Sequence, residues 1–156
     1  MTTIDVYADV GCPFAHVGLR RLVAIREQRG SSARLRVRPW PLELVNGTPM
    51  DAEFIADEIV DIRTQVAPDL FTNFRVDAFP STFLPAMALV EAAYGRNDET
   101  GEELSLAVRT ALFEEGRNGA DDAVLAQLGA RYGVERVTDA DRQAVVESWE
   151  TGKGRG

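Results

Sequence analysis

The chain has 156 residues, of which 45% are hydrophobic and 27% charged, and its formal net charge is −8. This length and composition predict one globular domain, and the acidic balance argues against nucleic acid and anionic membranes as partners. No apolar run approaches the roughly 18 residues that cross a bilayer, and no signal-peptide pattern opens the chain. A single cysteine, Cys12, excludes an internal disulfide framework and favours a reducing cytoplasm.

Residues 3–38 predict a βαβ unit. Alternating hydropathy predicts a strand over 3–10, helical spacing predicts a helix over 13–29, and a second strand over 33–38 ends at two prolines. Two strands joined by a crossover helix are parallel, with a right-handed connection. The residues expected on the inner faces are Ile4, Val6, Ala8 and Val10, then Ala15, Leu19, Leu22 and Val23, then Leu35 and Val37.

The pattern from Asp51 to about Gly133 is helical with breaks. The expected helices are 51–65 capped by Asp51, 82–94 capped by Ser81, 101–116, 121–132, and 138–149 with a capping box at 138–141. Residues 69–78 are less regular, and residues 151–156 are expected to be disordered. The chain therefore divides into an N-terminal half (1–50), a helical subdomain (51–133) and a final helix with its tail (134–156).

Cys12 is the candidate nucleophile. Pro13 favours the first helical position, so Cys12 falls at or next to the N-cap, beside unpaired N–H groups and the positive end of the helix dipole. These groups favour a thiolate, so we expect a pKa below the free value of about 8.5. The alternative is a small apolar core residue.

His16, the only histidine, follows four residues later on the same helical face. Protonated, it would stabilise a Cys12 thiolate, and neutral, it would accept the thiol proton. The alternative is an ordinary histidine without a catalytic role. No second Cys/His cluster exists to complete a metal site, so no metal is expected.

Pro13, Phe14 and Trp40 are the candidate substrate contacts. Pro13 starts the helix, whereas Phe14 either packs or binds, with packing favoured. Trp40 follows the second strand and should share an edge with Cys12, where it would wall an apolar pocket or pack in the core. Asp9 opposes a thiolate at Cys12 by charge repulsion unless it points away. The adjacent carboxylates Glu102–Glu103, Glu114–Glu115 and Asp121–Asp122 are interpreted as solvated.

Three stretches resemble the DsbA-like thioredoxin-fold family, whose relatives include 2-hydroxychromene-2-carboxylate isomerases and kappa-class glutathione transferases. Residues 9–18 resemble the C-P-x-C motif with its flanking residues, residues 38–44 the segment closing the second strand, and residues 112–134 the helical insertion. The resemblance implies an α/β fold: a thioredoxin-like βαβ unit with an inserted helical subdomain.

The chain departs from the family pattern at two places. Ala15 occupies the position of the second, resolving cysteine, which leaves monothiol chemistry with an outside thiol as the resolving agent. Family members also continue after the last helix with two strands and a cis-proline loop, for which this sequence has no counterpart. The C-terminal part of the thioredoxin fold is therefore expected to be missing. Truncation, sheet completion by homo-oligomerisation, and stabilisation by the helices remain open.

The resemblance implies a cytoplasmic thiol–disulfide oxidoreductase that uses a single cysteine, Cys12, with a small thiol or protein thiol as substrate. No cofactor is expected to be bound, and glutathione is the possible co-substrate. One alternative is a glutathione-dependent isomerase or transferase of the same superfamily, which Ala15 favours. Another is a non-catalytic, truncated binding module that keeps the helical subdomain as an interaction surface.

Overall fold

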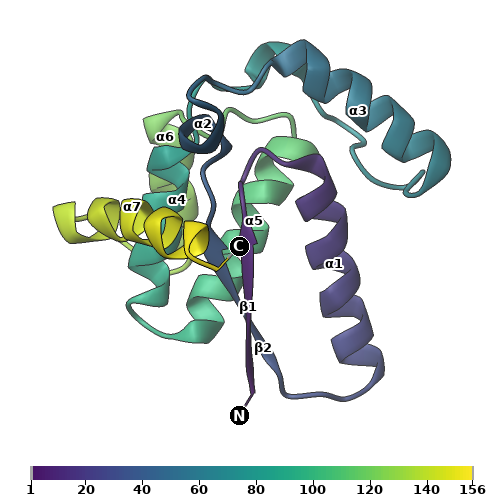
Figure 1. Cartoon of the computed structure of the whole chain (residues 1–156). Helices are drawn as coiled ribbons and strands as arrows, with labels where there is room; N and C mark the ends of the chain where they lie inside the picture. The colour runs from purple at the N-terminus through teal and green to yellow at the C-terminus, as the bar shows by residue number, and fades with distance from the viewer. Residues whose placement is uncertain (1, 156) are drawn as a thin grey trace.

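The computed structural model describes residues 2–155, which form two strands and seven α-helices around a mixed α/β core (Figure 1). The elements are β1 (Thr3–Ala8), α1 (Pro13–Gln28), β2 (Arg34–Pro39), α2 (Leu42–Asn46), α3 (Ala52–Gln65), the 3₁₀ turn η1 (Val76–Ala78), α4 (Leu84–Tyr94), α5 (Asp98–Phe113), α6 (Asp122–Arg131) and α7 (Asp139–Lys153). In Figure 1 the strands lie between α1 on one side and α4, α6 and α7 on the other. No helix in the described part is long and apolar enough to cross a membrane.

The sheet is the predicted parallel pair, with β1 in register with β2 from Thr3 opposite Arg34 to Ala8 opposite Pro39. Leu35 and Val37 are each 3% exposed, which confirms the predicted inner face of β2. A two-stranded sheet is marginal alone, so the surrounding helices must stabilise it.

Side chains from three helices satisfy the outer edge of β2. The Tyr94 hydroxyl donates to the carbonyl of Leu35 (3.0 Å) and accepts from the amide of Val37 (2.8 Å). The Glu102 carboxylate accepts from the amide of Leu35 (2.6 Å), and Ser148 donates to the carbonyl of Pro39 (2.8 Å). These groups take the place of a neighbouring strand, because each buried backbone donor or acceptor needs a partner.

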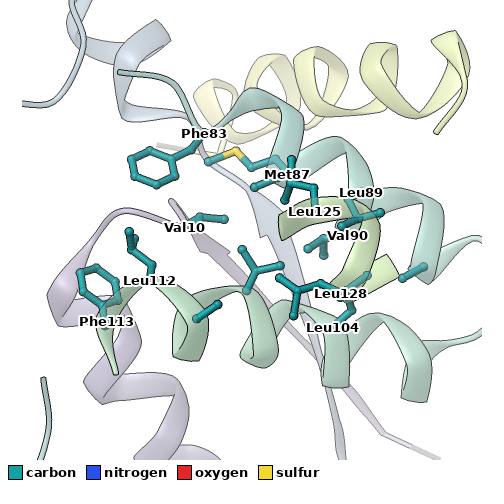
Figure 2. Packing of buried hydrophobic residues seen from close by; sticks show 14 of the residues in the cluster. Val10, Phe83, Met87, Leu89, Val90, Leu104, Leu112, Phe113, Leu125 and Leu128 are labelled. Atoms are coloured by element: carbon teal, nitrogen blue, oxygen red, sulfur yellow. The ribbon is translucent and has the colours of Figure 1, made fainter. Parts of the chain in front are cut away.

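The main hydrophobic core lies among the helices rather than on the sheet (Figure 2). Helix α4 is its centre: Ala86, Met87, Ala88, Leu89, Val90, Ala93 and Tyr94 are all buried. Val10, which follows β1, is 1% exposed and belongs to this cluster, so the core reaches the turn before Cys12. A smaller cluster of Ala8, Leu19, Leu35 and Val37 joins the sheet to α1.

Several predicted helix ends are confirmed. Asp51 and Asp121 accept hydrogen bonds from the first-turn amides of α3 and α6, and Thr138 and Asp141 form the expected capping box of α7. Gly30 ends α1 with a φ of 59°, a left-handed conformation that glycine adopts without strain.

Other boundaries differ from the prediction. β1 ends at Ala8 rather than residue 10, because the chain turns there. α4 begins at Leu84 with Phe83 as its N-cap, so the prediction of Ser81 as the cap is wrong; the Glu43 carboxylate accepts from the Phe83 amide instead (3.0 Å). α5 spans Asp98–Phe113 rather than 101–116, because Asn97 caps its start.

The expectation of a disordered tail is wrong as far as Lys153, where α7 ends. Gly152 faces the ring of Trp40, and the Lys153 ammonium lies 3.9 Å from the centre of the Trp149 ring, which stabilises the last turn. Leu22 is also misplaced by the prediction: it is 41% exposed, whereas His16 and Val17 take buried positions on α1.

Candidate active site

Cys12 is the N-cap of α1, as predicted, with extended backbone angles (φ −84°, ψ 114°) and Pro13 opening the helix. The side chain is half-buried, and it is the one free thiol of the chain. No side-chain hydrogen bond caps this helix end. The amides of the first turn therefore face the sulfur side of the N-cap without a competing carboxylate or hydroxyl.

Asp9 fixes the turn that carries Cys12. Its side chain is buried, at 2% exposure. One carboxylate oxygen accepts from the amide of Gly11 (2.8 Å), and the other accepts from the amide of Leu42 (2.7 Å). The carboxylate thus ties the turn after β1 to the start of α2, which follows β2.

Gly11 lets an aromatic ring close over the same turn. A Cβ atom at this position would collide with the ring of Phe83, which is 2% exposed. Phe83 is held by Glu43, whose Oε1 accepts from the Phe83 amide and from the Thr82 hydroxyl (2.9 Å). The residue before Cys12 must therefore be glycine for α4 to pack here.

The electrostatics of Cys12 differ from the prediction. Burial raises the pKa of the Cys12 thiol; the backbone amides of Ala15 and Phe14 lower it, and the carboxylates of Asp9 and Glu58 raise it further. The net direction is upward, so the predicted low pKa is wrong. The helix N-terminus does favour the thiolate, but desolvation and two acidic neighbours outweigh it.

His16 is held by a carboxylate rather than by the thiol. Its ring is 1% exposed, and its Nε2 lies 2.8 Å from Oε2 of Glu114. Within residues 2–155 no hydrogen bond joins its ring to Cys12. Burial lowers the pKa of His16, although the bond to Glu114 opposes the change. A catalytic role for His16 remains a prediction, whereas its contact with Glu114 is structural.

The same carboxylate also holds the segment between α3 and η1. Glu114 accepts from the amide of Phe71 (2.8 Å), and its second oxygen lies 3.4 Å from the amide of Thr72. Phe71 is buried with a φ of 61°, a conformation that costs free energy for a bulky side chain. Burial raises the pKa of Glu114, but the bonds from Phe71, His16 and Thr72 together lower it.

The interpretation of Glu102 and Glu114 as solvated is therefore wrong. Glu102 is 2% exposed and pairs with Arg26 (2.6 Å) as well as with the edge of β2. Adjacent residues of a helix face different directions, so one member of each pair turns inward and finds partners that are distant in sequence. Asp121 instead caps α6.

The three candidate substrate contacts separate in the structure. Phe14 is 58% exposed beside Cys12, so the expectation that it packs is wrong and the binding alternative remains. Pro13 is buried and serves the helix start. Trp40 packs edge-on against Tyr7, with ring centres 6.3 Å apart, and faces Gly152 of α7, so it takes the packing alternative.

Arg109 is a residue of this site that the sequence reasoning does not identify. It lies on α5 with 1% exposure, and its Nη2 donates to the carbonyl of Asp9 (3.2 Å). The available sequence signal is its position four residues after Ser105 on the apolar stripe of α5, where a charged residue is out of place. No group of three His, Cys, Asp or Glu side chains that could hold a metal ion occurs among the residues described.

A parallel βαβ unit that presents one cysteine at the start of its crossover helix, followed by an all-helical segment, defines a thioredoxin-like α/β domain. The model of the DSBA-like thioredoxin domain family matches residues 3–150, and the chain belongs to that family. The predicted fold class is thereby confirmed.

Among solved structures, the chain is similar to the cytosolic disulfide reductase DsbM from Pseudomonas aeruginosa. The TM-score is 0.60 at 20% sequence identity, and the match covers 97% of this chain and 73% of that one. At this identity the likeness supports the fold. A search of curated proteins found no match.

Proposed function

We propose that the protein is a thiol–disulfide oxidoreductase that works through Cys12 alone and acts as a reductase. Membership of the DSBA-like family supports this chemistry at the family level. The observation that carries the proposal is the position of the one free thiol, half-buried at the N-cap of α1 and followed by Pro13. Ala15 stands one turn along, so no second sulfur of this chain resolves a disulfide at Cys12.

The reaction divides into three exchanges that balance in atoms and electrons. The Cys12 thiolate attacks a substrate disulfide, forms a mixed disulfide and releases one substrate thiol. A first glutathione attacks the Cys12 sulfur, which releases the second substrate thiol and leaves Cys12 bound to glutathione. A second glutathione then releases Cys12 and departs as oxidised glutathione. Two glutathione thiols thus supply the two electrons that reduce the substrate disulfide.

The direction of the exchange follows from the environment of the sulfur. A strongly oxidising disulfide needs a stabilised thiolate as its reduced product. Burial and the Asp9 and Glu58 carboxylates instead raise the pKa of Cys12. The thiolate form is disfavoured, so Cys12 is a good attacking group and a poor leaving group, which favours reduction of the substrate. A reducing cytoplasm, with small or protein disulfides as substrates, suits this role, and the name of the similar DsbM structure agrees with it.

The test is glutathione-dependent reduction of a small aliphatic disulfide by the wild-type protein and by Cys12→Ser. We expect turnover by the wild type alone, together with glutathione attached to Cys12 detected by intact mass. Circular dichroism of the variant establishes that its fold is retained. Equal rates with the two proteins would overturn the proposal.

Two alternatives keep specific support. The single cysteine with Ala15 suits a glutathione-dependent isomerase or transferase, for which glutathione binding without disulfide reduction is the expected result. The raised pKa of the half-buried thiol suits a non-catalytic binding module, for which neither glutathione binding nor turnover is expected. Equilibrium binding of glutathione to Cys12→Ser, measured by calorimetry, separates these two outcomes.

A further inference from the structure

A guanidinium lies buried beneath the turn that carries Cys12. Nη1 of Arg109 donates to the carbonyl of Ser105 (2.9 Å) and to its hydroxyl (2.6 Å), and Nη2 donates to the carbonyl of Asp9 (3.2 Å). Within residues 2–155 its Nε has no hydrogen-bond partner. Burial lowers the pKa of Arg109 to about 10, so the side chain is still a cation at neutral pH. A buried charge of this kind needs a counter-charge.

The counter-charge is Asp9, although the two side chains form no direct ion pair within the described residues. Both oxygens of the Asp9 carboxylate accept backbone N–H groups, from Gly11 and Leu42, which suits the ionised form. Burial raises the pKa of Asp9, while these two bonds and the charge of Arg109 lower it. One buried anion and one buried cation thus flank the turn that leads to the nucleophile.

We propose that Asp9 and Arg109 are a pair of positioning residues that sets the charge around Cys12: Asp9 keeps the sulfur in its thiol form at rest, and Arg109 offsets that effect while holding the main chain of Asp9. The pair comes from two separate elements, the end of β1 and the middle of α5, and meets at one carbonyl. The inference rests on the proposed function for its purpose, which is to keep Cys12 a reductant.

The charged groups that act on Cys12 are few. Asp9 and Glu58, the latter from α3, disfavour the thiolate, whereas the amides of Phe14 and Ala15 favour it. Arg109 and the Cys12 thiolate attract each other. Removing the Asp9 charge therefore favours the thiolate, and removing the Arg109 charge disfavours it, in opposite directions from nearly the same place.

The experiment is the pH dependence of iodoacetamide alkylation, read by intact mass, which is unambiguous because the chain has one cysteine. We expect Asp9→Asn to lower the midpoint of the profile by about one pH unit and Arg109→Met to raise it by a similar amount. The double variant should fall between the two single variants. Asp5→Asn is the matched control, because Asp5 lies on β1, pairs with Arg38 at 3.1 Å, and does not act on Cys12.

Midpoints equal to wild type in both single variants would overturn the inference. So would midpoints that both move to the free-thiol value of roughly 8.5, because that result means loss of the turn and a purely structural role. If one single variant does not fold, the double variant is compared with the remaining one, and the sign of their difference decides. Alkylation reads the thiol itself, so shifted midpoints without disulfide turnover would refute the proposed function and leave this inference standing.

Discussion

The Glu114 carboxylate is the point at which one substitution should remove most from the fold. It accepts from Nε2 of His16 and from the amide of Phe71, both at 2.8 Å, and both donors are buried. In Glu114→Ala each donor loses its partner, and an unsatisfied buried donor costs about 1–3 kcal/mol. The same bonds also hold Phe71 at a φ of 61°. We therefore expect a loss of about 2–5 kcal/mol in the free energy of unfolding.

Thermal unfolding followed by circular dichroism measures the effect. For a chain of this size each 1 kcal/mol lowers Tm by about 2–4 °C, so the expected decrease is about 5–15 °C. Glu115→Ala is the matched control. Its side chain is 43% exposed and its partner Arg117 lies at 3.8 Å, so it should change the free energy by less than about 0.5 kcal/mol. Similar Tm values for the two variants would refute the assignment of Glu114 as the shared acceptor.

Two further outcomes are expected at the same site. Burial holds the pKa of His16 below its usual value of 6.5, so the unfolded chain binds the proton more readily, and stability should fall as pH drops below 6.5. Urea unfolding at about pH 7.5 and about pH 5.5 should show this loss in the wild type and a smaller one in His16→Gln; equal losses would contradict it. Gly11→Ala should destabilise the protein by about 1–3 kcal/mol, because the new Cβ meets the Phe83 ring. Gly18→Ala, in open space within α1, should instead stabilise it by about 0.5–1 kcal/mol.

The local features of this protein can be predicted from its sequence because short-range physics decides them. Alternating hydropathy locates both strands, and the caps at Asp51, Asp121 and Thr138 are recognisable because a side-chain oxygen near a first-turn amide is a contact between neighbours in sequence. Cys12 is placed at the N-cap for the same reason, since Pro13 fits the opening of the helix and not its interior.

The charge state of the site depends instead on partners distant in sequence. His16 meets Glu114 across 98 positions, and Arg109 meets Asp9 across 100. Neither contact leaves a periodic signal, so the sequence suggests a solvated Glu114 and does not single out Arg109. The inward turn of Trp40 likewise requires the position of α7, which places Gly152 against its ring.

The sequence by itself determined the βαβ unit, the helix start at Cys12 and the absence of a second thiol, because each is local or a matter of composition. The tertiary structure alone decided how that thiol behaves. The helix N-terminus lowers the pKa of Cys12, as the sequence implies, but the depth of burial and the carboxylates of Asp9 and Glu58 raise it by more. Desolvation is a property of everything packed around an atom, and so it could not be predicted from the residues on either side of Cys12.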